Sequence, residues 1–203
     1  MTEVQEKHIP VLYGELIESL HFFETGKNII VDATLGLGGH ASGVLQKLGR
    51  WDIFIGLDCD EVNLTSAQQR IEKTLADTPK NKQPTLYFVH TNFGTLDDTL
   101  DILGISHITA LYADLGVSSV HFDTPERGFS FRFDGPLDMR LDVTQWVTAA
   151  HLVNTLPYDK MAEIFRIYGD ESRAGFIAKK IIEARVIHPF ETTQQLADVV
   201  VKA

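Results

Sequence analysis

A strand that ends in an acid and runs into a glycine-rich turn is the first feature of the sequence that could do chemistry. Residues 31–41 read Val-Asp-Ala-Thr-Leu-Gly-Leu-Gly-Gly-His-Ala, with Asp32 directly before the turn. Glycines suit such a turn because a residue without a Cβ lets the backbone bend sharply and lie against a ligand. Asp58 follows Gly36 by 22 positions, at the end of the next expected strand, where a carboxylate can accept both hydroxyls of an adenosine ribose. We therefore expect a site for a nucleoside cofactor.

Two classes of cofactor compete for this turn. Gly36, Gly38 and Ala41 satisfy the spacing G-x-G-x-x-[GA], which nicotinamide-dependent oxidoreductases also use. Asp32 favours S-adenosyl-L-methionine, because a carboxylate at this place can bind the ammonium group of its methionyl end but would repel the pyrophosphate of a dinucleotide. S-adenosyl-L-methionine is the expected cofactor. A nicotinamide-dependent oxidoreductase and a purely structural glycine turn are the alternatives.

A third carboxylate stands at the end of a later apolar run. Residues 111–119 read Leu-Tyr-Ala-Asp-Leu-Gly-Val-Ser-Ser, so Asp114 ends the expected fourth strand. In open α/β sheets ligands bind outside the carboxyl ends of the strands, and Asp114 would therefore face the same crevice as Asp32 and Asp58. In that crevice it is a candidate catalytic residue that orients an acceptor amine or takes its proton. The structural alternative is that Asp114 caps the next segment.

The stretch 124–140 mixes aromatic side chains with arginines. It reads Thr-Pro-Glu-Arg-Gly-Phe-Ser-Phe-Arg-Phe and then, after Asp134, Gly-Pro-Leu-Asp-Met-Arg. Aromatic rings stack on unpaired bases, and arginines bind phosphates. Arg127, Phe129 and Arg140 are therefore candidate substrate contacts. The alternative, which we favour for each phenylalanine taken alone, is that the rings are buried at a junction between domains.

The elements that must position these residues follow from the hydrophobic pattern. Strands are expected at 28–33, 52–58, 85–90 and 108–114, and helices at 11–22, 40–48, 61–75 and 96–103. Strands that alternate with helices predict a parallel sheet with helices on both faces. After an irregular stretch at 115–142 we expect helices only, at 144–156, 158–168, 171–186 and 193–202. The sequence thus predicts a cofactor-binding α/β domain at 1–125 and a mainly helical domain at 126–203.

Composition and charge limit the class of protein. Of the 203 residues 44% are hydrophobic and 23% are charged, which is typical of a soluble globular chain. The net charge of −10 argues against a protein that coats nucleic acid by charge alone. Residues 1–125 carry 8 basic and 17 acidic side chains, whereas residues 126–203 carry 10 and 11. The second part is therefore better suited to contact phosphates.

Cysteine and histidine usage points away from metal and disulfide sites. Cys59 is the single cysteine, so an intramolecular disulfide and a cysteine-based zinc cage are excluded. The histidines lack metal-ligand spacing, and we expect no metal. Residues 1–8 contain no apolar signal core, and no apolar run is long enough to span a membrane, so a cytoplasmic location without membrane contact is expected.

Five segments, taken in order, resemble the ribosomal RNA small-subunit methyltransferase H family, also called MraW. They are residues 8–12, 32–40, 114–119, 127–131 and 135–140. The match spans nearly the whole chain, and the motifs Asp-Leu-Gly-Val-Ser-Ser, Arg-Gly-Phe-Ser-Phe and Gly-Pro-Leu-Asp-Met-Arg are far more specific than a glycine turn. The resemblance implies a Rossmann-like methyltransferase fold with a helical insertion domain. It also implies methyl transfer to the N(4) amine of a cytidine in small-subunit rRNA.

The resemblance implies a set of cofactor contacts as well. They fall on Gly38, Gly39, His40, Asp58, Phe93 and Asp114. A further family contact is a glutamine in a Ser-Ser-Pro-Gln segment, where this chain has Val120 and His121. His121 can still donate or accept one hydrogen bond.

The resemblance also sets an expectation about length. The family's fold continues for three more strands after the helical insertion, so we expect a sheet that is incomplete at its C-terminal side, with the fourth strand at an exposed edge. This leaves one more alternative open, an RNA-binding or ribosome-assembly factor that keeps the fold but has lost catalysis. The expected partner is the rRNA of the small ribosomal subunit, and the sequence leaves a homodimer open.

Overall fold

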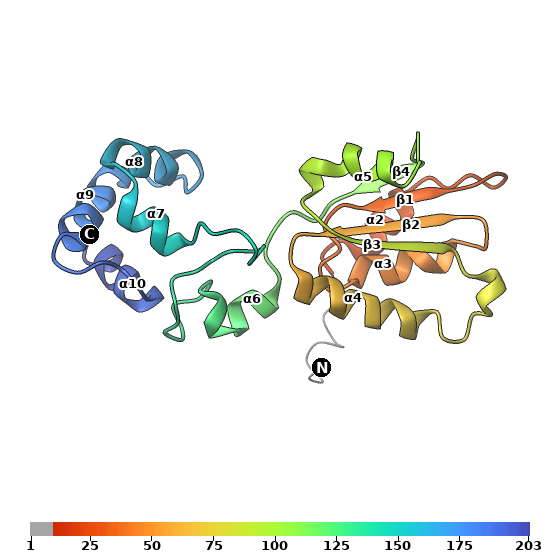
Figure 1. The fold of residues 1–203 in the computed structure, drawn as a ribbon, viewed down its shortest axis with the longest axis horizontal. Helices are drawn as coiled ribbons and strands as arrows, with labels where there is room; N and C mark the ends of the chain where they lie inside the picture. The colour runs from red at the N-terminus through yellow and green to blue at the C-terminus, as the bar shows by residue number, and fades with distance from the viewer. Residues whose placement is uncertain (1–9) are drawn as a thin grey trace. The chain divides into compact units, whose positions relative to one another are not determined.

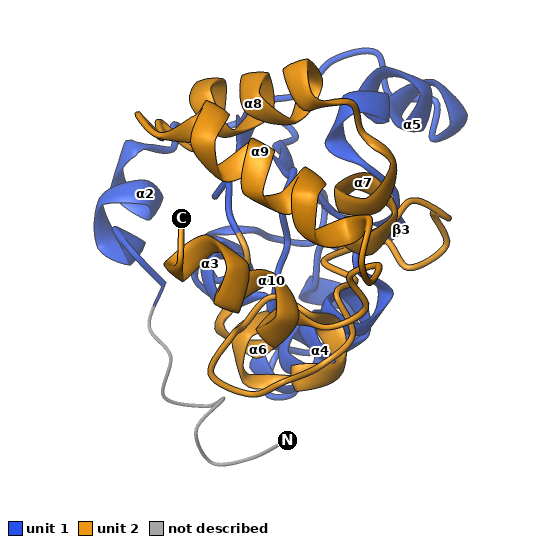
Figure 2. Ribbon diagram, turned by 90° about the vertical axis from the view of Figure 1, so that its left-hand side faces the viewer, with its two compact units in different colours: residues 1–116 blue, residues 117–203 orange. Residues whose placement is uncertain are grey.

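The computed structural model describes residues 10–203. The predictions for residues 1–9, including the His8-Ile9 part of the family motif, lie outside the described residues. The chain divides into two compact units, residues 1–116 and 117–203 (Figure 2). The contacts thus group residues 117–125 with the second unit, whereas the sequence pattern groups them with the first.

A four-stranded parallel sheet is the frame of the first unit (Figure 1). Its strands are β1 (Ile29–Asp32), β2 (Ile53–Asp58), β3 (Thr85–His90) and β4 (Ala110–Tyr112), in the order β3-β2-β1-β4. All neighbouring pairs are parallel, and Asp32 lies opposite Gly56 of β2 and Tyr112 of β4. The carboxyl ends of the strands therefore meet at one edge of the sheet. The predicted α/β fold is confirmed, with β4 at an edge of the described sheet.

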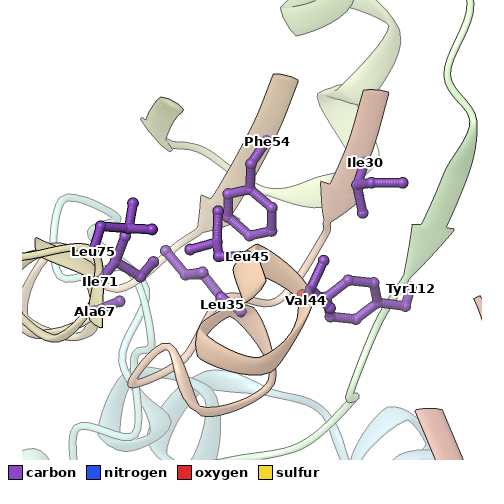
Figure 3. Close-up of a cluster of buried hydrophobic side chains, with 10 residues drawn as sticks. Ile30, Leu35, Val44, Leu45, Phe54, Ala67, Ile71, Leu75 and Tyr112 are labelled. Atoms are coloured by element: carbon purple, nitrogen blue, oxygen red, sulfur yellow. The ribbon is translucent and has the colours of Figure 1, made fainter. Parts of the chain in front are cut away.

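Helices cover both faces of this sheet. They are α2 (Tyr13–Ser19), α3 (Gly39–Val44), the 3₁₀ turn η1 (Leu45–Lys47), α4 (Glu61–Thr74) and α5 (Leu96–Ile102), with further 3₁₀ turns at Lys80–Lys82 and Phe93–Thr95. Alternate strand residues point to opposite faces, and this alternation produces two apolar clusters. One joins Ile30, Phe54 and Tyr112 to α3 and α4 (Figure 3). The other joins five buried residues of β1 and β2 to the leucines of α5; they are Ile29, Val31, Ile53, Ile55 and Leu57.

The second unit is helical. It contains α6 (Ser119–Asp123), a 3₁₀ turn at Pro125–Arg127, α7 (Ala149–Thr155), α8 (Tyr158–Ile167), α9 (Ala174–Arg185) and α10 (Thr193–Val201). The apolar faces of α7, α8, α9 and α10 pack around one core, whose buried members are Leu137, Met161, Ala162, Ala178, Ile181 and Phe190. Because Leu137 belongs to this core, the long connection between α6 and α7 is anchored to the helices.

The predicted helices of the second unit begin too early at two places. Residues 144–148 are not helical, because the Asp142 carboxylate accepts hydrogen bonds from the backbone N–H and the hydroxyl of Thr144 and holds a turn there. Thr148 then caps α7 by accepting the N–H of His151. The helix predicted from 171 begins at Ala174, since the Glu171 carboxylate accepts the N–H of Arg173. In both cases an acidic side chain competes with the backbone for the first hydrogen bonds of a helix.

Two further observations concern only residues 10–203. None of the helices there combines the length and the apolar character that a membrane crossing requires. No group of three or more His, Cys, Asp or Glu side chains in that part of the chain is arranged to hold a metal ion.

Candidate functional site

The turn after β1 requires glycine at two positions. Gly36 and Gly38 have φ angles of 54° and 74°, in the left-handed region that residues with a Cβ rarely adopt. A Cβ on Gly38 would lie 3.2 Å from the Cα of Ala67, so this glycine also allows α4 to approach closely. The N–H of Gly38 closes the turn by donating to the Leu35 carbonyl oxygen at 2.9 Å. The sequence prediction of a glycine-dependent turn therefore has a local structural basis.

Asp58 ties this turn to the end of β2. Its Oδ2 accepts the N–H of Gly36 at 2.7 Å, and its Oδ1 accepts the N–H of Asp60 at 2.8 Å. The side chain is nearly buried. A carboxylate has about four lone-pair sites, so holding the turn is compatible with binding the hydroxyls of a ribose. The carboxylate at the end of β2 and the glycine turn thus form one unit.

Asp32 is buried at the end of β1. Its Oδ1 accepts the N–H of Thr34 at 3.1 Å. Burial raises the pKa of this carboxyl from 3.8 to about 7; the neighbouring carboxylates of Asp58 and Asp114 add to the rise, and Tyr112 and the N–H of Thr34 oppose it. Among residues 10–203, none of the groups that act on Asp32 is a cation. A cationic ligand group would stabilise the ionised form of this carboxyl.

Asp114 lies after β4 at the same edge of the sheet. Its backbone N–H donates to the Thr34 hydroxyl at 2.7 Å, which links the end of β4 to the turn after β1. The side chain is exposed, and its charge acts on Asp32. The next helix is capped by Ser118 and not by Asp114, so the structural alternative for this acid is not what the structure shows. The structure therefore brings Asp32, Asp58 and Asp114 together, as the sequence analysis expects.

His40 and Gly39 face the segment that precedes the sheet. The His40 Nε2 lies 3.0 Å from the Val11 carbonyl oxygen, and because a carbonyl only accepts, Nε2 carries the hydrogen. The His40 ring is buried and stacks on Tyr13 at 6.3 Å between centroids. A Cβ on Gly39 would clash with Pro10. The side chain of His40 thus holds the segment before α2 against the start of α3.

Phe93 occupies the corresponding position after β3. It begins a 3₁₀ turn that Asn92 stabilises by accepting the N–H of Gly94 at 2.8 Å. About half of its ring is exposed. Because β3 is parallel to β2, Phe93 lies at the same edge of the sheet as Asp58.

The predicted site residue His121 lies in the second unit. Its side chain is buried, and Nδ1 accepts the N–H of Ser118 at 3.0 Å, which forms a capping box at the start of α6. Its ring packs against Phe129 at 4.9 Å between centroids. His121 and Phe129 therefore stabilise each other inside this unit.

The two predicted substrate arginines hold the long connection between α6 and α7. Arg127 donates to the carbonyl oxygens of Arg140 and Leu141 at 2.9 and 3.1 Å. Arg140 forms a bidentate pair with Asp138 at 2.8 and 2.6 Å and donates to the Val143 and Gln145 carbonyl oxygens. This pairing keeps the pKa of Asp138 below its usual value. Both guanidinium groups are thus engaged in hydrogen bonds within the loop.

Two phenylalanines that the sequence analysis did not single out are exposed. The side chains of Phe131 and Phe133 are 72% and 58% exposed, and Arg132 between them is exposed as well. Neither ring is therefore buried by its own unit, and burial at a junction between domains stays a prediction. A signal was present in the Phe-Arg-Phe sequence itself, but the pattern does not tell which ring of the motif packs inward. The structure shows that Phe129 does.

Tyr112 is a third residue that the sequence analysis did not single out. It stands beside Asp32 in the β1–β4 register, and its side chain is buried. The signal that could have found it is its place two residues before Asp114, on a strand that borders the site.

Comparisons with known proteins agree with this geometry. The MraW methylase family matches residues 5–203. The chain is similar to ribosomal RNA small subunit methyltransferase H of Lactobacillus delbrueckii subsp. bulgaricus, at 43% identity over 97% of this chain and 61% of the relative. It is 38% identical to the protein of the same name from Clostridioides difficile, over 97% of this chain and 60% of the relative. The protein of that name from Lactobacillus gasseri is 44% identical, over 96% of this chain and 60% of the relative.

The chain spans about three fifths of the length of these curated relatives. Within that span lie the parallel sheet, the glycine turn and the three carboxylates at the end of its strands. A family match over nearly the whole chain, together with relatives at this level of identity, shows that the chain belongs to the MraW methylase family.

Proposed function

We propose that the first unit binds S-adenosyl-L-methionine at the carboxyl ends of β1, β2 and β4. The observation that carries the proposal is the buried carboxyl of Asp32, on which no cation from residues 10–203 acts. Such a carboxyl suits the ammonium group of the methionyl end. Asp58 would accept the ribose hydroxyls, and the backbone of the turn at Gly36 and Gly38 would lie against the ligand. The same buried acid disfavours a dinucleotide, whose pyrophosphate it would repel.

The reaction that this site supports is transfer of a methyl group to a base amine of small-subunit rRNA. Bound S-adenosylmethionine supplies a methyl group that its sulfonium has already activated. The work of the chain is therefore alignment and exclusion of water. Asp114, whose backbone Thr34 holds in place, would accept a hydrogen bond from the amine and take its proton. The names of the relatives support the rRNA substrate, and the family resemblance supports the N(4) amine of cytidine as acceptor.

We assign the RNA contacts of the second unit to the exposed segment around Phe131 and Phe133. An unpaired base can stack on either ring, and the exposed Arg132 is available for a phosphate. Arg127 and Arg140 would act indirectly, because their hydrogen bonds shape the loop that presents these rings.

Transfer of a labelled methyl group to isolated small ribosomal subunits tests the proposal. The 203-residue chain is incubated with labelled S-adenosylmethionine and subunits from cells that lack the endogenous enzyme, and an Asp114→Ala chain serves as the matched control. Label in the N(4) position of a cytidine, lost in the variant, supports the proposal. Cofactor binding without transfer would favour a binding or assembly factor. Tight binding of NADH in place of S-adenosylmethionine would favour an oxidoreductase.

A further inference from the structure

Asp32 and Tyr112 form a buried polar pair on the face of the sheet that α3 covers. They are register partners on adjacent parallel strands, so both side chains leave the sheet on the same face. Figure 3 shows the Tyr112 ring beside Val44 of α3. The Tyr112 hydroxyl is buried and makes no hydrogen bond of standard geometry with any residue from 10 to 203. The hydroxyl interacts with the carboxyl of Asp32 and lowers the pKa of that carboxyl.

The groups that face this pair come from every neighbouring element. Asp58 at the end of β2 and Asp114 after β4 oppose a negative charge on Asp32, and the N–H of Thr34 in the turn favours it. From α3, the His40 ring meets the Tyr112 ring edge-on at 6.3 Å between centroids. Among the groups that act on Asp32, Tyr112 is the one that offers a side-chain O–H. A donor in this buried position affects the carboxyl more strongly than a donor at the surface would, because water cannot replace it.

We propose that Tyr112 is a positioning residue, whose hydroxyl donates to Asp32, orients this carboxyl and favours its ionised form for the ammonium group of an amino-acid-bearing nucleoside. This inference rests on the proposed function, since it concerns the same ligand. It goes further because it assigns the methionyl end of the site to a pair of residues. A phenylalanine at position 112 keeps the ring that packs on α3, so Tyr112→Phe removes only the donor.

The first test compares two ligands at pH 7 by calorimetry. S-adenosylhomocysteine carries the amino-acid end, whereas 5′-methylthioadenosine keeps the adenosine and the thioether without it. Tyr112→Phe should weaken S-adenosylhomocysteine roughly tenfold, as expected for loss of one hydrogen bond to a charged group, and leave 5′-methylthioadenosine within about twofold. Equal losses for both ligands, or no loss for either, would overturn the proposal, because they indicate a packing role or none.

Tyr87→Phe is the matched control. Tyr87 is a partly buried tyrosine on β3 that packs in the cluster on the opposite face of the sheet. Removal of the Tyr87 hydroxyl should change neither the affinity for S-adenosylhomocysteine nor that for 5′-methylthioadenosine. An effect of the same size as that of Tyr112→Phe would again overturn the proposal.

The second test needs no ligand. The carboxyl of Asp32 is titrated by carbon-detected NMR in the wild-type chain and in Tyr112→Phe. Its midpoint should rise by about one pH unit in the variant, because the donor that favours the ionised form is gone. An unchanged midpoint refutes the link between the two residues even if the affinities differ. If the wild-type chain binds neither nucleoside, the proposed function fails, and this titration still decides the role of Tyr112.

Discussion

Replacing Asp32 with asparagine should stabilise the chain at high pH while it removes cofactor binding. The pKa of Asp32 rises from 3.8 to about 7 on folding, chiefly because the carboxyl is buried. Between these values the folded chain holds a proton that the unfolded chain releases, so the free energy of unfolding falls as the pH rises through this window. At about 1.4 kcal/mol per pH unit, the wild-type chain loses roughly 4 kcal/mol by pH 8 relative to a variant that cannot ionise there.

Urea unfolding at pH 4 and at pH 8 measures this difference. Hydrogen exchange of the β1 and β2 amides at the same two pH values measures it independently. Asparagine keeps an oxygen for the N–H of Thr34, so the two chains should be about equally stable at pH 4. At pH 8 the Asp32→Asn chain should be the more stable by up to about 4 kcal/mol. Its affinity for S-adenosylhomocysteine should fall about a hundredfold, since breaking a buried charge pair costs roughly 3 kcal/mol.

Asp114→Asn is the control, because it makes the same chemical change at an exposed position. It should alter the unfolding free energy by less than about 0.5 kcal/mol at either pH. The reasoning is refuted if Asp32→Asn destabilises the chain at pH 8, or if its effect is the same at pH 4 and pH 8.

Three further predictions concern the other site residues. Asp58→Ala should lower the affinity for S-adenosylhomocysteine by at least about tenfold, as measured by calorimetry. It should also lower the unfolding free energy by about 2 kcal/mol in a urea titration, because two backbone N–H groups lose their acceptor. Asp114→Ala should reduce methyl transfer by about a hundredfold and cofactor affinity by less than about threefold, and equal losses would make it a cofactor ligand. Phe131→Ala should weaken binding of single-stranded RNA by about 1–3 kcal/mol in a filter assay without changing cofactor affinity, whereas an unchanged RNA affinity would remove this ring from the interface.

The strands could be predicted from the sequence because their signals are local. Each buried strand is a short apolar run, and β3 is found at its predicted bounds of 85–90. The boundaries that sequence missed depend on a side chain that captures a backbone N–H, as Asp142 and Glu171 do before α7 and α9. An aspartate such as Asp142 can equally stand in the first turn of a helix. Only the folded geometry tells which of the two roles it plays.

Sequence predicts the place of a side chain where the topology of the fold decides it, but not the hydrogen-bond partners of a side chain in a loop. Asp32, Asp58 and Asp114 end parallel strands, and topology alone places them at one edge. Arg127 and Arg140 are arginines in a loop, and a sequence does not tell whether a guanidinium meets a phosphate or a carbonyl oxygen of its own chain. These are tertiary contacts between residues of one loop, which no periodicity encodes.

The buried acid also shows what the site costs the fold. Asp32 lowers stability as the pH rises towards 7 and above, because burial raises the pKa of this carboxyl to about 7 and disfavours its charged form. The proposed site needs this acid, because a neutral residue would not pair with an ammonium group away from water. The expected gain in stability of Asp32→Asn is thus the counterpart of the lost binding, as in other sites that trade stability for function.

Perturbation of backbone amide signals by S-adenosylhomocysteine tests the central claim most directly. In the NMR spectrum of the 203-residue chain, we expect the largest shifts at Gly36, Gly38, Asp58 and Asp114, the residues at the carboxyl ends of the strands. Amides at the opposite ends of β1 and β2 should not shift. Absence of shifts at millimolar ligand, or shifts confined to the second unit, would contradict the assignment of this edge of the sheet as the cofactor site.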